Sequence, residues 1–277
     1  MKQKILFMMI DMNVGGTEKA FLNLVSEIDF TKYDVTLLLL EEKGGFLKDV
    51  PNEVQIETLE NYEQIKDEIM LPPLVCAKKA MHIKKYLKAV GILFYHIIFK
   101  ISNDRTSYYK YIIRKLKKKE GYDVAIAFAG PMEFITTYIL EKVEANKKIQ
   151  WIHFDISKNG TNLKHARRNY PKFNKIFVVS DQAKQILIDA IPSIDKITET
   201  KQNVVSEAAC LKLAEVGETY RNYDGIKILT VGRLYREKGQ DIIPEVARQL
   251  KKEGYDFKWY LIGEGSIRKE IEKKIEE

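Results

Sequence analysis

The sequence is poor in cysteine and has no long apolar run. Its two cysteines, Cys76 and Cys210, are far apart and have no histidines at ligand spacing, which argues against a disulfide framework or a zinc site. The apolar run that opens the chain is too short for a secretory signal peptide and ends at Asp11 and a glycine turn. We therefore interpret it as a first strand and expect the protein to stay in the cytoplasm. Internal repeats and low-complexity tracts are also absent from the sequence.

The composition is that of a soluble globular protein. Its 277 residues are 45% hydrophobic and 31% charged, enough for one large domain or two smaller ones. The net charge of +7 is unevenly spread. Between Lys78 and Lys119 there are 13 Lys/Arg and a single acid, Asp104, so this segment carries +12 and the rest of the chain about −5. Such a basic patch indicates a partner surface rather than a fold.

Apolar, β-branched runs alternate with helical patterns along the first two hundred residues. The run at residues 4–10 predicts a first strand, and Thr17, after the glycine turn, is expected to cap the first helix. Further strands are predicted at residues 34–40, 54–59, 123–128, 148–153 and 175–180. Alternating strands and helices predict an α/β fold with a parallel sheet and right-handed crossovers.

A second strand-turn-helix pattern begins at Ile226. An apolar strand stops at Gly232-Arg233, Lys238-Gly239 follows, and a helical pattern runs from Asp241 to Gly254. Two cations five residues apart are thus placed at the carboxyl edge of a sheet, where phosphorylated ligands bind in open α/β folds. Arg233 offers a rigid fork of donors and Lys238 a mobile point charge. The alternative is that both are ordinary surface cations beside a strand.

The order of these pieces carries a family resemblance. Val231-Gly-Arg-Leu-Tyr-Arg-Glu-Lys-Gly239, a helix, and then Trp259-Tyr-Leu-Ile-Gly-Glu-Gly265 resemble the opening of the second lobe in the family 4 retaining glycosyltransferases. The resemblance implies the GT-B architecture of two facing Rossmann-like lobes, with Arg233 and Lys238 holding the diphosphate of a nucleotide-sugar donor. It also implies a hinge near Asn203. We therefore expect an acceptor-side N-terminal lobe at residues 1–204 and a nucleotide-sugar-binding C-terminal lobe at 205–277.

The predicted second lobe is short. From Ile226 it offers a strand, a helix, a strand at residues 257–262 and a charged helix at 266–275, which is about a third of a Rossmann-like lobe. The family's later motif, two glutamates eight positions apart, is missing. We therefore expect a truncated chain or a natural fragment with little or no transfer activity of its own.

The glycine turn after the first strand is a second candidate site. In Gly15-Gly16-Thr17-Glu18, glycines allow close approach of backbone to ligand, and the start of a helix presents free amide donors. The family has a similar loop that faces the donor phosphates and the acceptor, which implies donor binding by Gly15 and Gly16 and an acceptor or sugar contact by Glu18. The alternative is a tight strand-to-helix turn.

Two further positions are assigned through the resemblance. His153, at the end of a predicted strand, matches a family histidine that contacts the donor sugar, and Asp155 is expected either to orient the imidazole or to touch the acceptor. Gly263 and Glu264 follow the strand at residues 257–262, where the family borders its donor cleft. The alternatives are a structural histidine and a plain strand-to-helix connection.

No Asp-x-Asp pair occurs among the 14 aspartates. Metal-dependent sugar transferases use that pair to hold a divalent ion against the diphosphate. Its absence suits a mechanism in which protein cations neutralise the leaving group, so we expect no metal and no cofactor.

The basic segment suggests a membrane surface. Residues 91–99 form an apolar and aromatic stretch that is shorter than the about 20 residues needed to span a bilayer. A basic amphipathic segment can instead lie on an anionic leaflet, and the expected membrane surface comprises Lys78, Lys79, Lys84, Lys85 and Lys88. The alternative is a core-packed helix pair with a solvated charged face. No nucleic-acid-binding module accompanies the charge, so nucleic acid is not an expected partner.

Together these observations predict an enzyme. We expect a retaining, hexosyl-type glycosyltransferase that moves a sugar from a nucleoside-diphosphate sugar to a glycan or lipid-linked acceptor, in the synthesis of cell-surface polysaccharide. The alternative is a non-catalytic fragment that binds acceptor or membrane. The sugar, the nucleobase and the linkage are not encoded in any motif found here.

Overall fold

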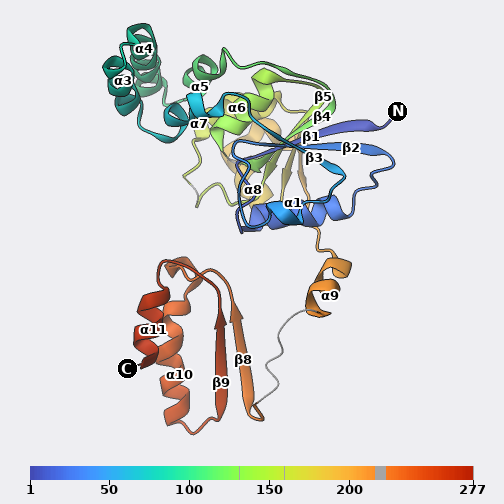
Figure 1. The fold of residues 1–277 in the computed structure, drawn as a ribbon, viewed down its shortest axis with the longest axis vertical. Helices are drawn as coiled ribbons and strands as arrows, with labels where there is room; N and C mark the ends of the chain where they lie inside the picture. Colours follow the sequence, from blue (N-terminus) through green and yellow to red (C-terminus); the bar gives the residue numbers. More distant parts are fainter. Residues whose placement is uncertain (131, 159, 216–222, 277) are drawn as a thin grey trace. The chain divides into compact units, whose positions relative to one another are not determined.

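The computed structural model describes residues 1–130, 132–158, 160–215 and 223–276 (Figure 1). The chain forms two compact units, Met1–Cys210 and Leu211–Glu277, which we call unit 1 and unit 2. The boundary predicted after residue 204 lies a few residues before this division. Each unit is described by itself.

Unit 1 contains a parallel sheet in the order β3-β2-β1-β4-β5-β6-β7. Its strands are β1 (Gln3–Met9), β2 (Tyr33–Leu39), β3 (Val54–Thr58), β4 (Lys119–Gly130), β5 (Val143–Ile152), β6 (Lys175–Val178) and β7 (Thr198–Thr200). The first six were predicted from their apolar runs. β7 was not, because three residues reading Thr-Glu-Thr give no apolar signal. The order reverses between β1 and β4, which is the topological switch point of such a sheet.

Helices surround this sheet and explain its composition. They are α1 (Gly16–Ser26), α2 (Lys66–Met70), α3 (Pro73–His82), α4 (Tyr86–Ser102), α5 (Thr106–Ile113), α6 (Glu133–Lys142), α7 (Leu163–Asn169) and α8 (Asp181–Ala190). In β1, Leu6 and Met8 belong to one hydrophobic cluster, while Phe7 and Met9 belong to another. The strand is therefore buried on both faces, and so its sequence is apolar throughout rather than alternating.

The helical pair α3–α4 lies at the periphery of unit 1, away from the sheet (Figure 1). Only Ala89 and Ile92 of α4 are buried, although the helix is rich in apolar residues. No helix in the described parts of the chain combines the length and the apolar character needed to cross a bilayer.

Unit 2 has two parallel strands, β8 (Ile226–Val231) and β9 (Phe257–Ile262), at the predicted positions. The helix α10 (Ile243–Lys252) lies between them in the chain, and α11 (Arg268–Glu276) follows β9. The helix α9 (Glu207–Glu215), which begins before Leu211, precedes β8. The helix predicted to begin at Asp241 instead begins at Ile243, because Pro244 occupies a first-turn position and the preceding residues form a 3₁₀ turn after Gly239 in the left-handed region (φ 67°). Leu234, Ile267 and Ile271 form its small core.

Candidate functional site

The turn between β1 and α1 has a glycine at the cap position of the helix. Gly15 is the N-cap of α1, and no side chain caps the helix, so the expectation that Thr17 does so is wrong: Thr17 lies inside the first turn and is buried. The Glu18 carboxylate folds over Gly15, because a Cβ there would lie 2.3 Å from Glu18 Oε2. A Cβ on Gly16 would meet no atom within 4 Å. The turn therefore combines a helix start that has no side-chain cap with one carboxylate, which accepts from its own backbone amide.

A second carboxylate adjoins this turn. Asp11 is buried just after β1 and accepts hydrogen bonds from the Asn13 backbone (3.0 Å) and side-chain amide (2.7 Å). Burial, together with the Asp11 charge, raises the pKa of Glu18. Sequence reasoning used Asp11 only as a turn marker, although a carboxylate directly after a buried strand could have signalled a site residue.

His153 follows β5 and is enclosed by aromatic rings. Its ring lies 4.4 Å from the Phe128 ring and stacks parallel to Trp151 at 5.9 Å, centroid to centroid. Both ring nitrogens are buried, and neither forms a hydrogen bond of normal geometry with the described residues, although the Phe128 backbone and the Asn203 side chain lie close enough to interact weakly with the ring. Burial lowers the pKa of His153 to about 4, and the nearby Phe128 backbone and Asn203 side chain offset only part of this shift. The imidazole is therefore neutral at physiological pH.

Asp155 does not orient this histidine. Its Oδ1 accepts hydrogen bonds from the Ser157 backbone (2.9 Å) and hydroxyl (2.7 Å), and Oδ2 lies 3.7 Å from Lys158 Nζ. These local bonds to Ser157 lower the pKa of Asp155. Of the two roles predicted for Asp155, orientation of the imidazole is excluded by this geometry, and contact with an acceptor stays a prediction.

His165, to which the sequence assigned no role, is a core residue. It is 2% exposed, and its Nε2 lies 3.1 Å from the Thr137 hydroxyl. Burial lowers its pKa to about 4. Near it, Glu133 at the start of α6 has one buried carboxylate oxygen without a partner among the described residues, and burial raises its pKa to about 7. Because an isolated glutamate has no sequence pattern, sequence reasoning could not single it out.

The shifted pKa values of these groups predict that the stability of the protein depends on pH in the acid range. His153 and His165 take up protons near pH 6.5 in the unfolded chain, but only near pH 4 in the folded chain. Their contribution to the free energy of unfolding is therefore lost as the pH falls from 6.5 to 4. Glu133 acts oppositely, because its pKa rises from 4.5 to about 7 on folding. Among these three groups the unfolded chain binds one more proton than the folded chain, which lowers the free energy of unfolding by about 1.4 kcal/mol per pH unit between pH 6.5 and 4.5.

Urea denaturation of unit 1 monitored by tryptophan fluorescence would measure this slope. In a His165→Gln variant, which removes one of the two titrating imidazoles, the slope in this window should fall by about 1.4 kcal/mol per pH unit. Equal unfolding free energies at pH 6.5 and 4.5 in the unchanged protein would contradict the assignment.

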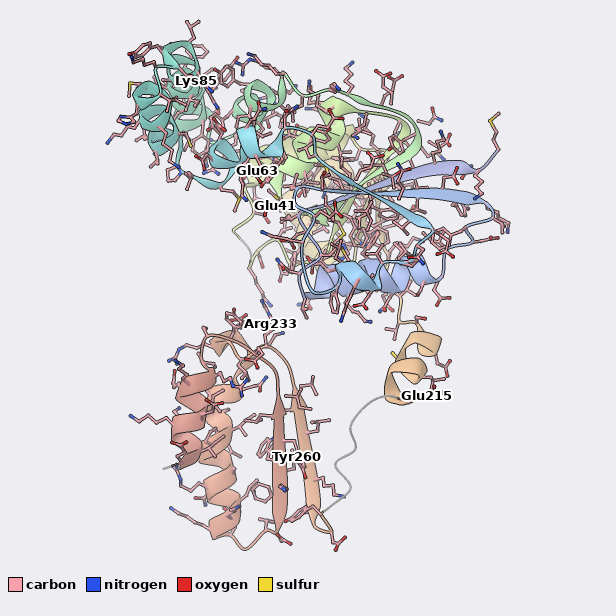
Figure 2. The ribbon with its side chains drawn as sticks, in the orientation of Figure 1. Glu41, Glu63, Lys85, Glu215, Arg233 and Tyr260 are labelled. Atoms are coloured by element: carbon pink, nitrogen blue, oxygen red, sulfur yellow. The ribbon has the colours of Figure 1, made fainter. Side chains whose placement is uncertain are left out.

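In unit 2, Arg233 and Lys238 flank the turn that follows β8. Arg233 projects from the end of the strand (Figure 2), its side chain is 60% exposed, and its Nη2 lies 3.2 Å from Glu237 Oε1. Its guanidinium also lies 5.1 Å from the centre of the Tyr235 ring. Lys238 is exposed and ends a 3₁₀ turn, and no carboxylate in the described chain lies within ion-pair distance of it. Neither cation is buried in an ion pair, so both are available to a ligand.

A close backbone contact holds this turn against the turn after β9. Gly232 donates to the Ile262 carbonyl (3.0 Å), and Leu234 donates to the Glu264 carbonyl (2.9 Å). A Cβ on Gly263, which has φ 157°, would lie 1.9 Å from the Gly232 oxygen. Gly263 is therefore required by packing, whatever its role towards a ligand.

The Glu264 side chain is 78% exposed and pairs with Arg268 one helical turn on. Buried Gln240, which the sequence did not single out, donates from Nε2 to the Gly232 oxygen (3.1 Å) and so fixes the carbonyl beside Arg233. These hydrogen bonds thus hold the backbone of the turn that carries the two exposed cations, Arg233 and Lys238.

The five lysines predicted as a membrane surface divide into two groups. Lys79 pairs with Asp67 at 2.8 Å, and Lys88, which is half-buried, pairs with Glu68. Lys78, Lys84 and Lys85 are exposed, and no carboxylate of the described chain lies within ion-pair distance of them. Their lipid contacts stay a prediction.

No protein-family model matches the chain. Over 170 residues, 59% of this chain, it is 26% identical to the amylovoran biosynthesis glycosyltransferase AmsK of Erwinia amylovora, and the match covers 40% of AmsK. Its structure resembles that of Anabaena HepE, solved in complex with UDP and glucose, with a TM-score of 0.58 at 15% identity over 99% of this chain and 66% of HepE. It also resembles a mutant of S. aureus TarM, solved with fondaparinux, alpha-GlcNAc-glycerol and UDP, with a TM-score of 0.59 at 13% identity over 99% of this chain and 75% of TarM.

These comparisons establish the fold class. The chain has an α/β fold of the GT-B type, with a seven-stranded parallel sheet in unit 1, as the sequence predicted. It spans less than half the length of AmsK and about two thirds of HepE.

Proposed function

We propose that this protein is a glycosyltransferase that uses a nucleoside-diphosphate sugar and transfers the sugar, with retention of configuration, to a glycan or lipid-linked acceptor in polysaccharide synthesis. The observation that carries the proposal is the pair Arg233 and Lys238, two exposed cations on a rigid turn at the carboxyl end of β8. The fold shared with proteins solved in complex with UDP supports the nucleotide, and the likeness to AmsK supports the polysaccharide.

The chemistry of the pair suits a departing diphosphate. As the bond between sugar and diphosphate breaks, negative charge grows on the leaving oxygens, and cations already in place stabilise it without reorganisation. Arg233 would bind two phosphate oxygens with its fork, exchanging its exposed partner Glu237 for them, and Lys238 would add a point charge. In this mechanism the neutralisation is done by side chains, and we assign it no metal and no cofactor.

His153 would contact the sugar. Because it is neutral, it can donate from one nitrogen and accept at the other, which suits a sugar hydroxyl, whereas a pKa of about 4 is too low for a general acid at pH 7. Neither buried nitrogen has a hydrogen bond of normal geometry in the described chain, and a sugar hydroxyl would supply one of them with a partner. Glu18, beside Gly15 and Gly16 at the start of α1, would accept from a hydroxyl of the sugar or acceptor.

We predict that His153→Ala separates sugar recognition from nucleotide recognition. Loss of one hydrogen bond should weaken UDP-glucose binding by about three- to tenfold and leave UDP binding unchanged. Isothermal titration with each ligand measures both, and His82→Ala, at an exposed position on α3, is the control. Equal weakening of UDP and UDP-glucose would contradict a sugar contact.

We further propose that the protein attaches to the cytoplasmic face of an anionic membrane through the basic segment. The support is the charge of +12 between Lys78 and Lys119, together with the exposed, unpaired state of Lys78, Lys84 and Lys85. Each such cation contributes about 1 kcal/mol near an anionic leaflet. Flotation with liposomes measures this attachment directly.

A further inference from the structure

One face of α4 is apolar and exposed to solvent. Its residues recur every three or four positions, with exposed fractions between 57% and 91%: Leu87, Val90, Phe94, Ile97 and Ile101. The opposite face carries the buried Ala89 and Ile92 and packs on the core of unit 1. A contiguous apolar stripe of this kind on a protein surface marks an interaction site.

Cations surround this stripe. Lys84 and Lys85 form the turn before α4, Lys100 lies in its last turn, and Lys115 follows α5, all of them exposed and without an ion pair in the described chain. A second copy of this chain would bring the same positive charge against its own, which disfavours self-association through this face. An apolar surface ringed by cations is complementary to a lipid with an anionic head group.

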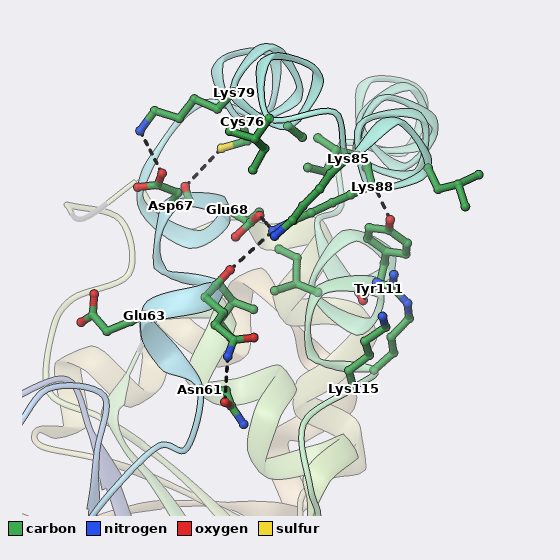
Figure 3. Close-up of a pocket in the computed structure, with 18 of the residues that line it drawn as sticks. Asn61, Glu63, Asp67, Glu68, Cys76, Lys79, Lys85, Lys88, Tyr111 and Lys115 are labelled. Atoms are coloured by element: carbon green, nitrogen blue, oxygen red, sulfur yellow. Dashed lines mark hydrogen bonds and ion pairs between the residues drawn. The ribbon is translucent and has the colours of Figure 1, made fainter.

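A pocket of about 1030 Å³ opens beside the stripe (Figure 3). It lies among the loop after β3, the α3–α4 turn and α5, and Lys84, Lys85, Arg114 and Lys115 contribute to its lining. In Figure 3, the side chains of Lys85 and Lys88 extend from the start of α4 into the pocket. Leu87, the most exposed residue of the α4 stripe, also lines it, so the pocket and the stripe are continuous.

The pocket floor contains an unsatisfied acceptor. Glu68 is 6% exposed; one of its carboxylate oxygens pairs with Lys88, and the other, Oε2, is buried without a partner among the described residues. The Glu68 charge is therefore compensated, but its second oxygen requires a donor. A hydroxyl on a ligand head group would supply one, next to cations that suit a phosphate.

We infer that this pocket binds the head group of a phosphate-bearing lipid, whose hydrocarbon chain lies along the exposed face of α4. Lys84, Lys85 and Lys115 bind the phosphate, and Glu68 accepts from a head-group hydroxyl. The inference rests on the membrane attachment proposed above, since both use Lys84 and Lys85, but the site lies wholly in unit 1 and shares no residue with the Arg233 turn, so it is independent of donor binding.

Flotation with phosphatidylcholine vesicles, with and without phosphatidylglycerol, tests the site on the whole chain. The protein should bind only the anionic vesicles, and K84Q/K85Q should weaken this binding by about thirty-fold, the value for two cations. The matched control is K78Q/K118Q, which removes two exposed cations, also without an ion pair in the described chain, from the same basic segment outside the pocket lining. Equal losses in the two double variants would show a diffuse charge effect and overturn the pocket.

Soluble ligands separate lipid from free phosphate. Farnesyl diphosphate should bind more tightly than pyrophosphate or farnesol, and L87S/F94S should reduce its affinity by about tenfold towards that of pyrophosphate. Both positions are exposed, and an unchanged melting temperature would confirm that the variant folds. If pyrophosphate bound as tightly as farnesyl diphosphate, the lipid assignment would be overturned. Farnesol binding as tight as that of farnesyl diphosphate would overturn it as well.

The role of Glu68 has its own test. Vesicles with phosphatidylmethanol carry the same charge as those with phosphatidylglycerol but offer no head-group hydroxyl. They should bind the unchanged protein several-fold more weakly, consistent with one lost hydrogen bond. Equal binding of the two lipids would remove Glu68 from the site.

Discussion

Replacing both Arg233 and Lys238 with alanine should reduce UDP affinity by about two to four powers of ten. A hydrogen bond to a charged group is worth about 1.5–3 kcal/mol, so two cations on one diphosphate account for about 3–6 kcal/mol. Each single variant should lose about half of this. The loss should be the same for UDP and UDP-glucose, because both carry the diphosphate that the cations are proposed to hold.

The structure provides a matched control for this experiment. Lys251 is an exposed cation in the last turn of α10, at the other end of that helix from the β8 turn, so Lys251→Ala removes one charge from unit 2 without touching the proposed site. Isothermal titration with UDP at two salt concentrations measures all variants. If the double variant bound UDP as tightly as Lys251→Ala does, the proposed function would have no diphosphate site.

Folding should survive these changes. Arg233 is 60% exposed, its partner Glu237 is 58% exposed, and an exposed ion pair of this kind contributes little to stability. Loss of binding in the variant can therefore be attributed to loss of ligand contacts. By contrast, Arg236 pairs with Glu270 (2.8 Å) and lies 3.6 Å from Asp241, so it fastens α11 to the turn and would be a poor control.

The buried strands were the most predictable part of the fold. Six of the strands in unit 1 coincide with apolar runs, as in β1, where side chains are buried on both faces and leave no polar alternation. Both strands in unit 2 also coincide with apolar runs, although no residue of β8 is buried. The positions of Arg233 and Lys238 could also be predicted, since a strand that stops at a glycine places the next side chains at the edge of the sheet.

Contacts between distant residues could not be predicted. Lys88 was assigned to the membrane surface from local charge alone, yet it pairs with Glu68, twenty positions earlier in the chain. The periodicity of α4 indicated an amphipathic helix but left open which face is covered, and only the packing of Ala89 and Ile92 shows that the Leu87 face is exposed. Thr17 was expected to cap α1 by residue type, whereas the backbone places Gly15 at that position.

Gly263→Ala should unfold the turn that carries Arg233. The residue has φ 157°, a conformation that alanine adopts only at a cost of about 1–3 kcal/mol, and its new methyl group would lie 1.9 Å from the Gly232 oxygen. That oxygen cannot move freely, because it accepts from Gln240 Nε2 and the Gly232 amide is bonded to Ile262. We expect UDP affinity to fall at least as far as in the double cation variant, although no cation has been removed.

Gly254→Ala is the matched control for this effect. Gly254 also has a positive φ, 89°, but a Cβ there would meet no atom within 4 Å, so only the conformational cost of about 1 kcal/mol applies. Hydrogen exchange measured by mass spectrometry should show lost protection across β8 and β9 in Gly263→Ala and near-native protection in Gly254→Ala. The two substitutions differ because the new methyl group in Gly263→Ala collides with backbone, whereas the one in Gly254→Ala meets no atom. Native-like protection of β8 in Gly263→Ala would mean that the Gly232 carbonyl can turn away, and the turn would then be too soft to hold Arg233 in place for a diphosphate.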